Sequence, residues 1–80
     1  MPSIYIQYFA ILREQRGLTR EQLSTAAVTP QALYEELRAR HNFTLPSDHV
    51  RAAVNGEFAA AAAPLRDGDE VVFIPPIAGG

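Results

Sequence analysis

The most distinctive chemistry of this chain lies in its last six residues: Pro75, Pro76, Ile77, Ala78, Gly79 and Gly80. The two terminal glycines have no side chains and tolerate nearly any backbone conformation, so they form the thinnest end that a protein can offer. Such an end can enter a narrow channel and place the Gly80 carboxylate in the active site of another protein. We therefore predict that Gly79 and Gly80 carry the reactive group of this chain.

The two prolines mark the boundary between this end and the body of the protein. Residues 70–74, Glu-Val-Val-Phe-Ile, are rich in β-formers and predict a strand. Proline lacks the N–H that a continuing strand needs, so pairing should stop at Pro75. We predict a domain over residues 1–75 and an extended tail over residues 76–80. At about 3.3 Å per residue, this tail can reach at most roughly 16 Å.

The composition describes one small globular domain and excludes several classes of protein. The 80 residues are 48% hydrophobic and 20% charged, and the net charge of −2 argues against a nucleic-acid partner. The absence of cysteine excludes disulfides, thiolate-held metals and a thiol nucleophile. No apolar run approaches the roughly 20 residues that a membrane span requires, and no signal peptide is evident, so we expect a cytoplasmic protein.

The alternation of residues 3–9 predicts a strand that contributes to the core. Ile4, Ile6 and Tyr8 should face inward, while Phe9 should point to the opposite face. The C-terminal strand has apolar residues on both faces, and a single layer of helix would leave one face uncovered. We expect an exposed apolar surface to form there from four residues: Phe9, Phe58, Val72 and Ile74. Such a surface beside a protruding tail is suited to docking a partner.

A short helix is predicted over residues 10–16. Gly17 follows at the position where a left-handed residue commonly ends a helix. The two apolar residues, Ile11 and Leu12, should face inward. The charged residues should face solvent: Arg13, Glu14 and Arg16.

The main helix should begin at Pro30 and end near His41. The Thr29 hydroxyl can cap the first N–H groups, and proline suits the first helical position. Leu33 and Leu37 stand four residues apart and should cover the sheet.

Three further strands complete the pattern. Residues 21–25 alternate weakly and should lie at a sheet edge, whereas residues 50–54 and 57–59 flank Asn55-Gly56, a strong hairpin signal. A sharp turn at Asp67-Gly68 then leads to the C-terminal strand. The element order predicts an α+β fold, in which a mixed sheet packs on one main helix with a short second helix.

The sequence contains no set of residues for conventional catalysis. No nucleophile, base and orienting group can be combined, and His41 and His49 are best interpreted as solvated side chains. The Asp67-Gly68-Asp69 run lacks the further oxygen ligands of a cation site, so we interpret it as a turn. All seven basic residues are arginines, so no side-chain amine could capture the chain's own C-terminus after activation. We expect no bound metal or cofactor.

Several segments together closely resemble the small subunit of molybdopterin synthase. They are Ala52-Ala53-Val54-Asn55, the run Pro64-Leu65-Arg66-Asp67-Gly68-Asp69-Glu70-Val71, Pro75-Pro76, Gly79-Gly80 and the N-terminal Phe9-Ala10-Ile11-Leu12-Arg13-Glu14. The resemblance covers nearly the whole chain. A terminal diglycine alone is weak evidence for this family, but the spacing of all these segments is strong evidence for it.

The resemblance implies a ubiquitin-like β-grasp fold and a role as a non-catalytic, sulfur-donating subunit. In that family, an adenylating enzyme of the ubiquitin-activating type uses ATP to convert the terminal carboxylate, here that of Gly80, into an acyl-adenylate. A sulfur donor protein then supplies the sulfur of a thiocarboxylate. The large synthase subunit uses this sulfur to build the dithiolene of molybdopterin from cyclic pyranopterin monophosphate, within a heterotetramer.

The same resemblance assigns partner contacts by position. Phe9, Phe58 and Ile74 fall where the family's apolar contacts lie, and Arg13 is a candidate polar contact. The tail residues that would enter the large subunit are Pro75, Pro76, Ile77 and Ala78.

Two alternatives stay open. The first is a sulfur carrier on the same fold that serves thiamine synthesis, cysteine synthesis or tRNA thiolation. Pro75-Pro76 and the turn at residues 67–70 favour molybdopterin synthase over these pathways. The second is a β-grasp interaction module whose tail is never activated, or a modifier conjugated to lysines.

Overall fold

The structure, a computed structural model, describes residues 1–76 of the chain. In chain order, its elements are β1 (Ser3–Tyr8), α1 (Ala10–Arg16), β2 (Arg20–Ser24), α2 (Pro30–His41), the 3-10 turn η1 (Ser47–His49), β3 (Arg51–Val54), β4 (Glu57–Ala59) and β5 (Glu70–Ile74). None of the helices in this described part is long and apolar enough to cross a membrane.

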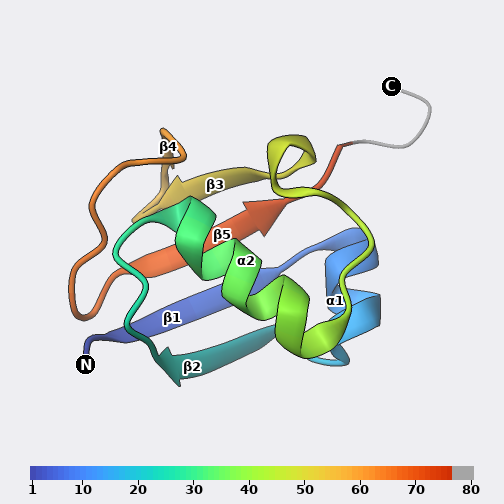
Figure 1. Cartoon of the computed structure of the whole chain (residues 1–80), viewed down its shortest axis with the longest axis horizontal. Coiled ribbons are helices and arrows are strands. Elements are labelled where there is room, and N and C mark those ends of the chain that lie inside the picture. Colours follow the sequence, from blue (N-terminus) through green and yellow to red (C-terminus); the bar gives the residue numbers. More distant parts are fainter. Residues whose placement is uncertain (77–80) are drawn as a thin grey trace.

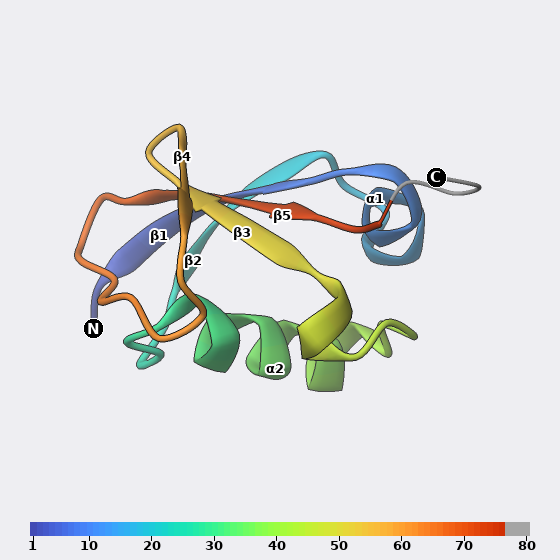
Figure 2. The same cartoon turned by 90° about the horizontal axis from the view of Figure 1, so that it is seen from above.

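The strands form one mixed sheet in the order β2-β1-β5-β3-β4. β5 runs parallel to β1, and the other neighbouring pairs are antiparallel. α2 crosses one face of this sheet, while α1 lies at the end where β1 and β5 finish (Figures 1 and 2). This arrangement confirms the predicted α+β fold, a ubiquitin-like β-grasp with one main helix and a short second one.

The core lies between α2 and the face of the sheet that α2 covers. Ile4, Ile6 and Tyr8 of β1 are at most 1% exposed, as their alternation predicts. Val71 and Phe73 of β5 are equally buried beside them. The helix contributes its own buried stripe of Leu33, Tyr34 and Leu37. A small domain without disulfides depends on this single apolar core for its stability.

Both ends of α2 lie where the sequence predicts them. Thr29 Oγ1 accepts a hydrogen bond from the N–H of Ala32 at 3.1 Å, and Pro30 occupies the first turn. Asn42 ends the helix in the left-handed region with φ of 56° and donates its N–H to the carbonyl of Arg38.

The packing of α1 differs from the prediction at Ile11. Leu12 is completely buried, but Ile11 is 38% exposed, so the expectation that both face inward was wrong. Neighbouring residues on an α-helix point about 100° apart, and a seven-residue helix that packs on one side buries only one of them. Gly17 ends α1 with φ of 81° and donates its N–H to the Arg13 carbonyl, which confirms the predicted C-terminus.

Candidate docking face and base of the tail

The C-terminal tail leaves from the middle of the sheet. β5 pairs with β1 on one side and with β3 on the other. Its last residue, Ile74, pairs with Arg51 of β3, one position beyond the last pair with β1, which joins Tyr8 and Phe73. The strand stops there, directly before Pro75, as the missing N–H of proline requires. The predicted reactive end and its spacer lie outside the described residues: Ile77, Ala78, Gly79 and Gly80.

The two prolines at the base of the tail differ in exposure. Pro76 is exposed, but Pro75 is buried. The alternation of β5 explains this difference, because Pro75 falls on the same side as Val71 and Phe73, which face the core. Pro76 is therefore the first tail residue exposed in the free chain, and the partner contact assigned to Pro75 stays a prediction.

A row of apolar side chains crosses the face of the sheet opposite α2. Phe58 of β4 pairs with Ala53 of β3, and Ala53 pairs with Val72 of β5. Paired residues share a face, so these three side chains lie in line on the uncovered side. Phe58 is 64% exposed, as predicted, and Val72 is half-buried.

A second row lies closer to the tail. Phe9 follows β1 in extended backbone and is 40% exposed. Because Tyr8 pairs with Phe73, Phe9 lies level with Ile74 of the parallel strand β5. We call the surface formed by Phe9, Phe58, Val72 and Ile74 the docking face. The structure thus brings the residues of the predicted apolar surface to one side of the sheet, directly beside the point where the tail begins.

The position of Phe58 depends on a tight hairpin. Asn55 and Gly56 have φ of 53° and 88°, the two left-handed residues that such a turn needs to match the twist of its strands. β3 and β4 pair from Ala52 opposite Ala59 to Val54 opposite Glu57. The predicted hairpin is therefore confirmed.

An arginine lies against the exposed aromatic of the docking face. The guanidinium carbon of Arg51 is 4.5 Å from the centroid of the Phe58 ring. Arg51 pairs with Ile74 and therefore points to the same side of the sheet. The sequence analysis missed this residue, although the alternation of β3 places Arg51 and Ala53 on one face.

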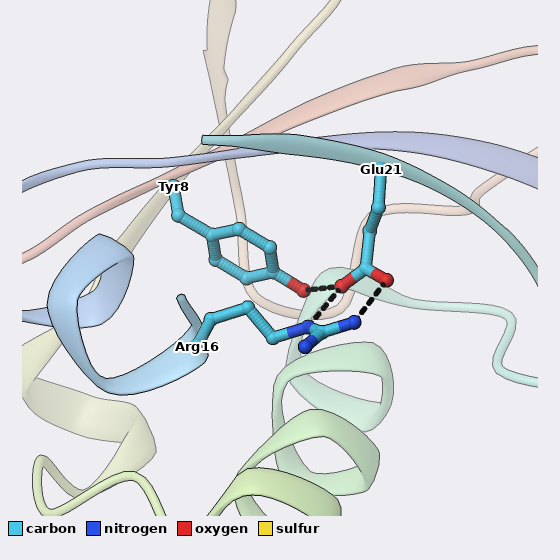
Figure 3. A network of polar contacts seen from close by, with 3 residues as sticks. All are labelled: Tyr8, Arg16 and Glu21. Atoms are coloured by element: carbon cyan, nitrogen blue, oxygen red, sulfur yellow. Dashed lines mark hydrogen bonds and ion pairs between the residues drawn. The ribbon is translucent and has the colours of Figure 1, made fainter. Parts of the chain in front are cut away.

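A polar cluster on the covered side of the sheet joins α1 to β1 and β2 (Figure 3). Glu21 of β2 accepts a hydrogen bond from the Tyr8 hydroxyl, and it accepts two more from the Arg16 guanidinium at 2.8 Å each. The expectation that Arg16 faces solvent was wrong, since its side chain is only 24% exposed. The overlooked signal is Glu21 itself: it shares the inward face of β2 with Leu23, where a carboxylate requires a partner. Arg13 of α1 is exposed, as expected.

Each member of the cluster shifts the protonation of the others. Burial, reinforced by the Glu21 carboxylate, raises the pKa of the Tyr8 hydroxyl far above its ordinary value. The hydrogen bonds from Arg16 lower the pKa of Glu21, although partial burial opposes this shift. The same hydrogen bond to Glu21 raises the pKa of Arg16. At neutral pH the cluster is therefore an ion pair capped by a neutral phenol.

In residues 1–76, no three histidine, aspartate or glutamate side chains gather closely enough to hold a metal ion. His41 lies at the end of α2, where burial and then the Arg16 charge lower its pKa, and His49 is exposed in η1. The described residues therefore offer a binding surface and the base of a tail.

The comparisons with known proteins agree with this arrangement. A family model described as the ThiS family matches residues 6–80. The molybdopterin synthase sulfur carrier subunit of Escherichia coli (strain K12) is 34% identical over 80 residues, which cover 96% of this chain and 99% of that protein.

Solved structures match over nearly the full length. A putative molybdopterin converting factor, subunit 1, from Pyrococcus furiosus gives a TM-score of 0.80 at 29% identity, covering 96% of this chain and 100% of that chain. SAMP1 from Haloferax volcanii gives a TM-score of 0.77 at 27% identity, covering 98% and 99%. A chain in the complex of subunits 1 and 2 of molybdopterin-converting factor from Helicobacter pylori gives a TM-score of 0.66 at 20% identity, covering 98% and 99%, and shows the fold alone.

Proposed function

This chain belongs to the ThiS family, and from that premise we propose that it is the sulfur carrier subunit of a molybdopterin synthase. The observation that carries the proposal is the position of Ile74. This residue is the last of the central strand before the tail, and it is also a member of the docking face. A partner that covers the docking face would therefore receive the tail at the edge of the same contact.

The proposed chemistry takes place at the Gly80 carboxylate. A carboxylate is a poor electrophile, so an adenylating enzyme first joins it to AMP, at the cost of one ATP and with release of pyrophosphate. A sulfur donor protein then supplies sulfur at the oxidation level of sulfide, which attacks the acyl carbon and displaces AMP, and this leaves a thiocarboxylate at Gly80. The carrier itself needs no bound cofactor in this scheme, because ATP is bound by the activating enzyme. Since the reaction depends on ATP, we expect it to take place in the cytoplasm.

The proposed acceptor is cyclic pyranopterin monophosphate held by the large subunit of the synthase. The thiocarboxylate sulfur is a soft nucleophile, and the tail of roughly 16 Å can carry it into a buried active site. A dithiolene contains two sulfurs, so two charged carriers serve each molecule of product. All catalytic residues would come from the large subunit, and this chain would supply the sulfur and the docking surface.

The partner contacts in this proposal follow from the exposed residues near the tail. Phe9, Phe58 and Ile74 would bury their apolar surface against the large subunit, and Arg13 of α1 would add a polar contact at the rim. Complexes of this kind have a precedent on the same fold, since the Helicobacter pylori structure contains subunits 1 and 2 of molybdopterin-converting factor together.

Reconstitution tests the proposal. The chain is charged with the adenylating enzyme, ATP and a sulfur donor, then mixed with the large subunit and cyclic pyranopterin monophosphate, and dithiolene product is measured. We expect product from the full chain and none from a chain that lacks Gly80, although both should have the same thermal unfolding midpoint. Absence of product from the charged full chain, with a large subunit that is active toward another carrier, would contradict the proposal.

A second candidate is a protein modifier that becomes linked to lysines of other proteins. The chain is similar to Haloferax volcanii SAMP1, and a second Haloferax volcanii structure that it matches is named small archaeal modifier protein 1. This likeness favours the alternative. Carriers for thiamine, cysteine or tRNA thiolation would share the same activation. Incubation of the charged chain with each acceptor separates these cases, since only a modifier forms amide-linked conjugates and only the matching pathway yields a sulfurated product.

A further inference from the structure

Arg51 places a positive charge directly beside the apolar residues of the docking face. The guanidinium of Arg51 lies 4.5 Å from the Phe58 centroid, and the pairing of Arg51 with Ile74 holds it next to the strand end that precedes the tail. Within residues 1–76, the ion pairs formed by arginines involve Arg16, Arg38 and Arg40. In this part of the chain, Arg51 therefore contacts an aromatic ring and has no carboxylate within 4.0 Å.

This arrangement has different consequences in the free chain and in a complex. In the free chain, Arg51 is exposed and water satisfies its charge, so the contact with the Phe58 ring contributes little. A partner that buries Phe58 must also remove water from the guanidinium stacked on it. Burial of an unpaired charge is strongly unfavourable, whereas a charge that meets an opposite charge at the interface is tolerated or favourable.

We propose that Arg51 determines partner specificity, and that the large subunit presents an Asp or Glu carboxylate to it beside the apolar site for Phe58 and Ile74. The inference rests on the proposed function, because it concerns the partner of the same face. The planar fork of the guanidinium matches the two oxygens of a carboxylate, and its contact with the Phe58 ring places it beside the apolar site that the partner would cover. A purely apolar partner surface would instead leave the charge buried without a counterion, and would be rejected.

The test is the affinity of the full chain for the large subunit at low and moderate salt. Arg51→Met removes the charge and keeps an apolar stem, so we expect affinity to fall at least about tenfold and its salt dependence to decrease. Arg51→Glu should weaken binding further, because two carboxylates would then face each other. The matched controls are Arg66→Met and Arg66→Glu, which make the same changes in net charge at the exposed turn before the opposite end of β5. These controls should stay within about twofold of the unmodified chain.

The results separate the failure of this inference from the failure of the proposed function. If the unmodified chain binds the large subunit and Arg51→Met binds as tightly, Arg51 serves only to cover Phe58 in the free chain, and the inference is overturned. The inference is also overturned if Arg51→Glu binds no more weakly than Arg51→Met. If the unmodified chain does not bind at all, the proposed function fails and the inference fails with it. Circular dichroism and the thermal midpoint of each variant verify that all five chains are folded.

Discussion

The side chain of Asn55 joins the hairpin that carries Phe58 to the turn that precedes β5 through a direct contact with Asp69. Asn55 Nδ2 donates to Asp69 Oδ1 at 3.0 Å, and Asn55 Oδ1 accepts from the N–H of Glu70, also at 3.0 Å. The backbone N–H of Arg66 donates to the other Asp69 oxygen at 2.8 Å. Asp69 therefore fixes two turns at once, and the hairpin carries a principal residue of the docking face.

Replacement of Asn55 tests this connection. Asn55→Ala loses two side-chain hydrogen bonds and places an alanine at φ of 53°, so we expect a loss of about 2 kcal/mol of unfolding free energy. Asn55→Gly keeps the backbone conformation and should lose about 1 kcal/mol. Urea denaturation measures both variants. Equal stability of Asn55→Ala and the unmodified chain would show that the hydrogen bonds to Asp69 and Glu70 contribute nothing.

Acid should weaken the same connection. The hydrogen bond from Asn55, followed by that from the Arg66 N–H, lowers the pKa of Asp69 in the folded state. A carboxylate whose pKa is lowered by folding stabilises the fold at any pH above its pKa in the unfolded chain, which is about 3.9. This contribution is lost as the pH falls through the lower pKa of the folded state. We expect the stability of Asp69→Asn to depend less on pH below about pH 4 than that of the unmodified chain. Identical acid profiles for the two chains would contradict this.

Tyr8 should make the fold sensitive to alkali. The pKa of Tyr8 is raised in the folded state, so its contribution to the unfolding free energy is complete at any pH below its pKa in the unfolded chain, which is about 10. This contribution is lost as the pH rises above that pKa. The chain contains no lysine, so side-chain amines add no titration in this range. Tyr8→Phe should show a smaller loss of thermal midpoint between about pH 9 and pH 11.

Tyr5→Phe is the matched control for the alkaline experiment, because Tyr5 is 47% exposed on the other face of β1. It should retain the alkaline sensitivity of the unmodified chain. Tyr34 also has a raised pKa, caused first by burial, so some sensitivity should persist in Tyr8→Phe. If Tyr8→Phe and Tyr5→Phe had the same alkaline profile, ionisation of Tyr8 would not be coupled to unfolding.

Truncation of Phe58 should affect binding and leave the fold intact. Phe58 is 64% exposed, so Phe58→Ala should change the unfolding free energy by less than about 1 kcal/mol. Exposed aromatics that become buried in an interface typically contribute about 2 kcal/mol or more, which corresponds to a loss of roughly 30-fold in affinity for the large subunit. Val28→Ala is a suitable control, since Val28 is equally exposed but precedes α2. Equal affinity of Phe58→Ala and Val28→Ala would exclude Phe58 from the interface.

Much of the fold could be predicted because local signals agree with the tertiary structure. Thr29 before Pro30 marks the start of α2, Asn55-Gly56 marks the hairpin, and the alternation of β1 identifies three core residues. These signals act over a few residues and require no knowledge of distant partners. The central place of β5 between β1 and β3 does not follow from such signals, because it depends on pairing between segments far apart in the sequence.

The errors arose where a distant element decides the outcome. Ile11 was expected in the core, but which of two neighbouring residues a short helix buries depends on where the sheet lies. Arg16 was expected in solvent because its partner Glu21 lies across a turn on another strand. The burial of Pro75 was overlooked, although continuation of the β5 alternation places it on the side of Val71 and Phe73. The contact between Arg51 and Phe58 was missed because it depends on the register of β3 and β4.

The central claim concerns Gly80, and the intact mass of the chain tests it most directly. The chain is incubated with the adenylating enzyme, ATP and a sulfur donor, and fragmentation then locates any change in mass. We predict a gain equal to the replacement of one oxygen by sulfur, confined to the C-terminal residue and absent when ATP is omitted or Gly80 is deleted. An unchanged mass, with an enzyme that charges another carrier under the same conditions, would contradict the account.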